Sequence, residues 1–296
     1  MRPGRLSRIR EPRRGPGRLV EMFAGWLGLG LSLAAVRPEG GMVASACGPS
    51  LESMADRAGS HSASHVGSPA GTVRVAVAAN FATTQEKLAA AFEAGSGHRV
   101  VAIVGSTGQL YAQILSGAPF DVFLSADRQR VDLLEAADAG VEGTRFTYAF
   151  GRLVLFAPSL DSIGAVDAEL RGARYRHLAV ANPATAPYGA AAMEVIEKLG
   201  LRSVVAPRLV RGESVAQTLQ FVKSRAAEAG FVAWSQVMDE PPRTWVFVPE
   251  SLHTPIAQDA VLLVTGEANP AARAYLAFLR GDVSRRIIRS AGYEVR

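Results

Sequence analysis

Short hydroxyl and amide side chains follow the ends of expected strands at several points of this chain. The stretch VGSTGQLYAQI, residues 104–114, places Ser106 and Thr107 between a strand pattern and a helix pattern. Asn80 has the same place in AVAANFATTQEKL, and APYG puts Tyr188 just before another helix pattern. The first turn of a helix has free backbone N–H groups and a positive partial charge. Each junction therefore predicts a point at which an anion binds.

A junction of this kind also has a purely structural explanation. Ser, Thr and Asn are preferred N-caps of helices in general, so Ser106 taken alone is better explained as a cap. The stretch GSTGQL lacks the GxxxxGK[ST] spacing and the lysine of a phosphate loop, which argues against nucleotide hydrolysis. Together, the junctions predict an anion site that is built without a lysine.

The elements that must position these junctions alternate along the chain. From Thr72 onward, strand and helix patterns follow each other, which predicts an α/β fold with a largely parallel sheet. Two extended runs, residues 146–159 and 254–265, are longer than an ordinary strand. We expect them to carry the chain into a second lobe and back. Ligands of open α/β sheets bind at the carboxyl ends of the strands, where the junctions would meet.

The N-terminal part has the composition of a targeting segment. An arginine-rich start precedes the apolar run of residues 23–36, which is too short to span a bilayer and predicts a signal peptide over residues 1–46. Two readings of ASAC remain: cleavage after Ala46, or lipid attachment at Cys47, the only cysteine. Residues 47–71 are rich in Ser, Gly and Ala and predict a flexible linker. Export from the cytoplasm is expected.

The distribution of charge argues against nucleic-acid binding. The sequence pI is about 9.7, but residues 1–71 hold nine of the 32 basic residues and five of the 27 acidic ones. The remaining 23 basic and 22 acidic residues nearly balance over residues 72–296. A nucleic-acid-binding domain would keep its basic excess in the folded part.

Taken together, the junction segments resemble a known family over about residues 73–293. The segments are VAVAANF, GSTGQLYAQILSGAPFDVFLSAD, FTYAFGRLVLFAP, VANPATAPYGAAAMEVIEKLGL, GESVAQTLQFV and GFVAWSQ. They are similar to the periplasmic molybdate-binding proteins of molybdate ABC importers. The resemblance implies the two-lobed type II periplasmic-binding-protein fold, in which each lobe has a mixed, mostly parallel sheet flanked by helices. Residues 72–150 and 253–296 would form one lobe, residues 151–252 the other, and the ligand would lie in the cleft between them.

The resemblance also implies a site and a set of partners. The implied oxyanion-binding residues are Ala79, Asn80, Ser106, Thr107, Tyr188 and Val215. Two departures are Asn80, where many members have serine, and Ala233, where one branch has a tyrosine whose role Tyr188 would take. The implied ligand is molybdate or tungstate, with no cofactor and no directly bound metal cation. The implied partners are a molybdate ABC transporter permease and its ATPase subunit. The protein itself is expected to be a monomer in the periplasm or another extracytoplasmic location.

Three alternatives remain at this stage. A receptor of the same fold for another oxyanion, sulfate above all, is not excluded by the residue types. An extracytoplasmic enzyme would need a nucleophile with a base. The folded part has only His98, His177 and His253 to supply a histidine, and neither His98 nor His253 is near a turn of the GxSxG kind. A sensor domain of this fold ranks lowest, since the sequence has no DNA-binding or signalling module.

Overall fold

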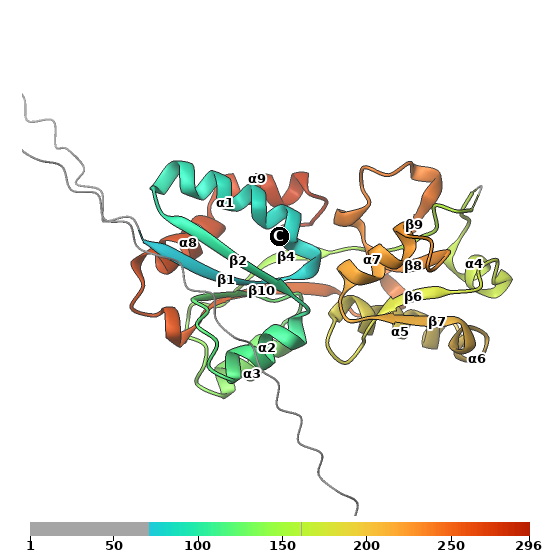
Figure 1. Cartoon of the computed structure of the whole chain (residues 1–296), viewed down its shortest axis with the longest axis horizontal. Helices are drawn as coiled ribbons and strands as arrows, with labels where there is room; N and C mark the ends of the chain where they lie inside the picture. Colours follow the sequence, from blue (N-terminus) through green and yellow to red (C-terminus); the bar gives the residue numbers. More distant parts are fainter. Residues whose placement is uncertain (1–70, 161) are drawn as a thin grey trace, which may run out of the picture. The chain divides into compact units, whose positions relative to one another are not determined.

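A computed structural model describes residues 71–160 and 162–296. The expected signal peptide, Cys47 and all but the last residue of the expected linker lie outside the described residues. The described chain contains two five-stranded sheets, each flanked by helices (Figure 1). We call the sheet that begins at Thr72 and its helices the first lobe, and the other sheet with its helices the second lobe.

The first lobe has the strand order β2-β1-β3-β10-β4. Its strands are β1 (Thr72–Ala78), β2 (Arg99–Gly105), β3 (Val122–Leu124), β4 (Phe146–Gly151) and β10 (Ile256–Leu262). β1 pairs in parallel with β2 and β3, whereas β10 pairs antiparallel with both β3 and β4. Only β10 therefore runs against the other strands of this sheet, in agreement with the expected mixed, mostly parallel arrangement.

Helices cover both faces of the first sheet (Figure 1). The helices α1 (Ala82–Ser96), α8 (Pro270–Arg280) and α9 (Asp282–Ser290) share a core with Val73, Val75 and Val77 of β1. On the other face, α2 (Thr107–Leu115) and α3 (Gln129–Ala136) pack around Ala76 and Phe123. Alternate residues of β1 thus point into two different cores, as the period of a strand requires.

The second lobe repeats this plan with the order β7-β6-β8-β5-β9. Its strands are β5 (Leu153–Phe156), β6 (Leu178–Ala181), β7 (Leu209–Gly212), β8 (Ala229–Ala233) and β9 (Trp245–Phe247). Its helices are α4 (Val166–Gly172), α5 (Pro187–Lys198), α6 (Arg202–Val205) and α7 (Val215–Lys223). β6 pairs in parallel with β7 and β8, and β5 pairs antiparallel with β8 and β9. One strand, β5, runs against the rest.

Short 3-10 helices complete the connections. They are η1 (Ala79–Phe81), η2 (Ala206–Arg208), η3 (Trp234–Gln236), η4 (Pro242–Thr244), η5 (Glu250–Leu252) and η6 (Val264–Gly266). The long extended run of residues 146–159 is divided at Arg152, so that β4 lies in the first sheet and β5 in the second. Arg152 lies over the ring of Phe247, 3.7 Å from the ring centroid. The chain returns to the first sheet between η5 and β10.

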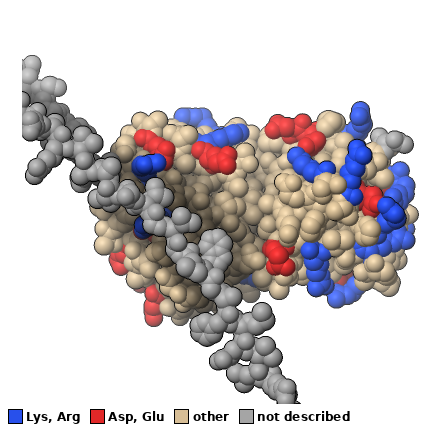
Figure 2. Space-filling view, in the orientation of Figure 1, with Lys and Arg blue, Asp and Glu red and all other residues tan. Residues whose placement is uncertain are grey.

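Charged side chains of both signs cover the surface. Figure 2 shows Lys and Arg side chains densest at the end of the second lobe that carries α4 and α6, with acidic side chains among them and over the first lobe. This mixture agrees with the near-balance of charge in residues 72–296. Among the described residues, none of the helices combines the length and the apolar composition needed to cross a bilayer.

Candidate functional site

Four helix N-termini meet at one small cavity between the two lobes. β1 ends at Ala78 and continues into η1 and α1, and β2 ends at Gly105 directly before α2. In the second lobe, α5 and α7 begin after β6 and β7. About 10 Å³ of this cavity is open to the centre of a water-sized molecule. Its lining, which we call the site cavity, consists of Ala78, Ala79, Asn80, Ser106, Thr107, Ala126, Ala186, Pro187, Tyr188, Ser214 and Val215.

All six residues expected to bind an oxyanion line the site cavity. Ala79 and Asn80 form the start of η1, Ser106 and Thr107 the start of α2, Tyr188 the second residue of α5, and Val215 the first residue of α7. The first lobe thus supplies four of them and the second lobe two. Ala233 is buried in β8 and is not part of the lining, so Tyr188 is the tyrosine at this site.

Five lining residues were not expected from the sequence: Ala78, Ala126, Ala186, Pro187 and Ser214. Two of them had a readable signal. Ser214 is followed three residues later by Gln217, and its Oγ accepts the Gln217 N–H at 3.2 Å as a helix cap. Pro187 is the first residue of α5, where proline is common. The three alanines have no chemistry of their own to mark them.

The lining contains no charged side chain. Every residue is small, apolar, or a neutral hydroxyl or amide. The positive field therefore comes from the helix N-termini and their first N–H groups. Such a site favours an anion without a counter-charge. Within the described residues, no three His, Cys, Asp or Glu side chains come together as a metal site.

Ser106 is the least satisfied polar group of the site cavity. Its residue is 3% exposed, and its Oγ is buried with no hydrogen-bond partner. Although it occupies the N-cap position of α2, its side chain accepts no capping hydrogen bond. The capping explanation of Ser106 is therefore wrong. A buried hydroxyl without a partner costs about 1–3 kcal/mol, and a ligand oxygen in the cavity would remove that cost.

Thr107 and Asn80 are both tied into the protein. The Thr107 Oγ1 accepts the backbone N–H of Ala126 at 3.1 Å, which leaves its own hydrogen free to donate. The Asn80 Nδ2 donates to Gln258 Oε1 at 2.9 Å and to the Tyr293 hydroxyl at 3.0 Å. Both amide hydrogens of Asn80 are used in this way. The side-chain hydrogens of Asn80 are therefore not available to a ligand in the cavity.

Tyr188 is fully enclosed and keeps its proton. Its residue is 1% exposed, and its hydroxyl accepts a hydrogen bond from Gln258 Nε2 at 3.4 Å. Burial raises the pKa of the Tyr188 phenol well above its ordinary value, and Tyr293 adds to the rise. Gly151 makes the position possible, because a Cβ on Gly151 would lie 2.0 Å from the Tyr188 hydroxyl.

The lobes touch directly beside the site cavity. The Gly108 N–H donates to the Thr185 carbonyl at 2.8 Å, which joins α2 to the segment before α5. Arg130 Nη2 donates to the Ala184 carbonyl at 2.7 Å, and its Nη1 pairs with Asp127 at 2.7 Å. The described structure is thus closed over the cavity.

Comparison with known proteins gives consistent matches over the two lobes. Residues 73–294 match the model of the bacterial extracellular solute-binding protein family. The chain is similar to a molybdate-binding protein of Azotobacter vinelandii, with 46% identity over 76% of this chain and 90% of the relative. It is 44% identical to a molybdate-binding protein of Rhodobacter capsulatus over 76% of this chain and 88% of the relative. A solved structure of the Azotobacter vinelandii periplasmic molybdate-binding protein superposes with a TM-score of 0.72 at 36% identity, covering 76% of this chain and 99% of that one.

Proposed function

Because the chain belongs to the bacterial extracellular solute-binding protein family, whose members bind a solute rather than convert it, we propose that it binds molybdate in the site cavity. We extend the proposal to tungstate, an anion of the same charge and shape. The observation that carries it is the buried Ser106 hydroxyl, which has no partner in the protein and lines a cavity at four helix N-termini. The identity to molybdate-binding relatives supports the choice of anion.

The donors suit a doubly charged anion. A hydrogen bond to a charged group contributes about 1.5–3 kcal/mol, so several such bonds support tight binding without a lysine or an arginine. Backbone N–H groups and buried hydroxyls are already ordered, and little conformational entropy is lost when they bind. Exclusion of water by the closed lobes strengthens each bond.

The donors also discriminate among oxyanions. None of the lining side chains is a carboxylate, so a protonated oxyanion such as hydrogen phosphate finds no ionised acceptor. The oxygens of molybdate and tungstate carry no hydrogen and only accept hydrogen bonds. They are larger than sulfate, and rigid donors placed for a larger tetrahedron leave sulfate with poorer hydrogen bonds.

Titration calorimetry with molybdate, tungstate, sulfate and phosphate tests the proposal. We expect molybdate and tungstate to bind at least about a hundredfold more tightly than sulfate, which corresponds to about 2.8 kcal/mol. Equal affinity for sulfate would overturn the molybdate assignment and favour a sulfate receptor. Absence of binding by all four anions would overturn the oxyanion site.

Delivery to a membrane permease is part of the same proposal. The two lobes are joined by the crossings at Arg152 and at residues 253–255, and rotation about them would open and close the site cavity. The closed, loaded form would dock on the permease of an ABC importer, whose ATPase subunit drives transport. We place this step in the periplasm, where the relative from Azotobacter vinelandii acts.

A further inference from the structure

A chain of buried hydrogen bonds runs behind the site cavity and begins at a backbone carbonyl. The Tyr293 hydroxyl donates to the carbonyl oxygen of Asn80 at 2.8 Å. A carbonyl oxygen only accepts, so the single hydrogen of Tyr293 is committed to it. The Ser235 hydroxyl in turn donates to the Tyr293 oxygen at 2.8 Å. Tyr293 can then only accept from any further neighbour.

The acceptor role of Tyr293 also determines how two side-chain amides are oriented. Because Tyr293 accepts, Asn80 must turn its Nδ2 toward it, and the second hydrogen of that Nδ2 reaches Gln258 Oε1 at 2.9 Å. The Tyr148 hydroxyl lies 3.1 Å from Gln258 Oε1 and 3.2 Å from the Ser125 carbonyl and has one hydrogen for the two, so the orientation of Gln258 rests on Asn80. Side-chain amides are ambiguous in isolation, but here each neighbour leaves one orientation. The Gln258 Nε2 consequently faces the Tyr188 hydroxyl.

The hydrogen bond between Gln258 and Tyr188 determines whether the Tyr188 hydroxyl donates to the ligand or accepts from it. Gln258 Nε2 donates to the Tyr188 oxygen, so the phenol hydrogen must point elsewhere. Among the described residues, the hydrogen bond found for this hydroxyl is the one from Gln258, which uses the Tyr188 oxygen and not its hydrogen. The remaining direction is the site cavity, which Tyr188 lines.

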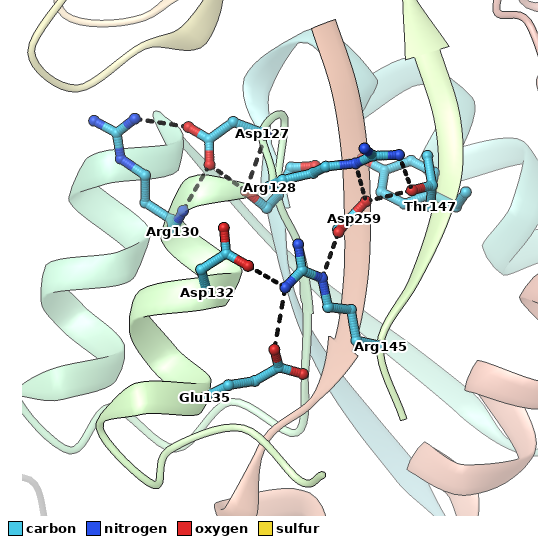
Figure 3. A network of polar contacts seen from close by, with 10 residues as sticks. Asp127, Arg128, Arg130, Asp132, Glu135, Arg145, Thr147 and Asp259 are labelled. Carbon is cyan, nitrogen blue, oxygen red and sulfur yellow. Dashed lines mark hydrogen bonds and ion pairs between the residues drawn. The ribbon is translucent and has the colours of Figure 1, made fainter. Parts of the chain in front are cut away.

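The backbone holds Gln258 firmly in this position. Gln258 is fully buried in β10, and the pairing of β10 with β4 shifts register between Gln258 and Asp259. A bulge of this kind re-aims the neighbouring side chains. Asp259 is anchored by Arg145 Nε at 2.6 Å and by the Thr147 hydroxyl at 2.7 Å (Figure 3). The charged network of Figure 3 thus fixes the strand that carries Gln258.

We propose that Gln258 is a positioning residue that keeps the Tyr188 hydroxyl as a donor toward the ligand, and that it thereby excludes protonated oxyanions from the site. A tyrosine free to rotate could accept a hydrogen bond from hydrogen phosphate. A tyrosine held by Gln258 can only donate. This inference rests on the proposed function and names the element of that site that selects fully deprotonated anions.

The test compares two anions of equal charge. The dissociation constants of molybdate and of hydrogen phosphate are measured by calorimetry for the wild type and for Gln258→Met, at a pH where phosphate is doubly charged. We expect Gln258→Met to weaken molybdate and strengthen hydrogen phosphate, so that their affinity ratio falls at least about tenfold. A general loosening of the site would weaken both anions and leave the ratio unchanged, which would overturn the inference.

Gln85→Met is the matched control. Gln85 is a fully buried glutamine of the same lobe whose Oε1 accepts the Tyr275 hydroxyl at 2.6 Å, away from the site cavity. Its substitution is expected to leave the ratio unchanged. In a Tyr188→Phe background, Gln258→Met should no longer change the ratio, because the hydroxyl through which it acts is absent. A full tenfold change in that background would also overturn the inference.

Tyr293→Phe serves if Gln258→Met does not fold. This variant removes the first tyrosine of the chain, frees the Asn80 amide to turn, and is expected to shift the ratio in the same direction. An unchanged ratio for folded Tyr293→Phe would overturn the inference. The wild-type titration tests the proposed function independently of these variants. If the wild type does not bind molybdate, the proposed function itself is refuted.

Discussion

Gly108→Ala is expected to weaken ligand binding without harming the fold. Gly108 is the second residue of α2, and its N–H donates to the Thr185 carbonyl of the other lobe at 2.8 Å. A Cβ on Gly108 would lie 2.8 Å from Thr185 Cα and 3.1 Å from the Thr185 oxygen. Both contacts are with backbone, which cannot move aside as a flexible side chain can. The lobes would therefore have to separate.

The size of the effect follows from two terms. Overpacking costs about 1–3 kcal/mol, and loss of the hydrogen bond between the lobes costs about 0.5–1.5 kcal/mol. Their sum, about 1.5–4.5 kcal/mol, corresponds to a loss of molybdate affinity of roughly 10- to 2000-fold. The ligand-free protein should be no less stable, since alanine is favoured over glycine in a helix by about 0.5–1 kcal/mol.

Calorimetric titration and thermal unfolding of the same sample measure both quantities. Gly95→Ala is the matched control, because Gly95 lies in α1 and its Cβ would meet nothing within 4 Å. The control should gain stability and keep wild-type affinity. The reasoning is refuted if Gly108→Ala binds molybdate within about threefold of the wild type, a difference of about 0.7 kcal/mol.

Three further predictions follow from the site. Ser106→Ala should weaken molybdate binding by about 1.5–3 kcal/mol in calorimetry while unfolding at or above the wild-type temperature, since it removes an unpaired buried hydroxyl; a loss of stability would contradict this. Molybdate at a hundred times its dissociation constant should raise the melting temperature by about 5–10 °C, and an unchanged temperature would count against a site. Burial raises the pKa of the phenols of Tyr148 and Tyr188 well above 10.0, so the free energy of unfolding should stay level below about pH 10 and fall above it, where only the unfolded chain ionises; alkaline denaturation measures this.

Much of the fold and several lining residues of the site cavity could be predicted, because the patterns that mark them lie within short stretches of sequence. Strand patterns followed at once by small polar residues and a helix pattern identify Asn80, Ser106 and Tyr188 without any distant contact. The motif resemblance added Ala79 and Val215, which present backbone groups and have no side-chain signal of their own. The run 146–159 was expected to cross between the lobes, and the observed division at Arg152 lies close to the expected boundary after residue 150, although both halves have the same extended, apolar pattern.

The buried residues that position the lining side chains could not be predicted from the sequence. Gln258 lies in PIAQDAVLL, which has the pattern of an apolar core strand interrupted by an amide and a carboxylate. Its partner Asn80 is 178 residues away in sequence, and Asn80 is 213 residues from Tyr293. The β-bulge that turns Gln258 toward the site has no glycine or other local marker. A buried polar residue in a strand is therefore worth tracing to its partners before it is assigned to the core.

Ligand binding and closure of the two lobes are thermodynamically coupled in this arrangement. Ala79, Asn80, Ser106 and Thr107 belong to the first lobe, and Tyr188 and Val215 to the second, so neither lobe alone surrounds an anion. Under the proposed function, the anion must gain enough from both sets of donors to hold the lobes together. A residue at the lobe contact, such as Gly108, then changes affinity without touching the anion. Conversely, a loss of affinity identifies a direct donor only when closure of the lobes is shown to be unchanged.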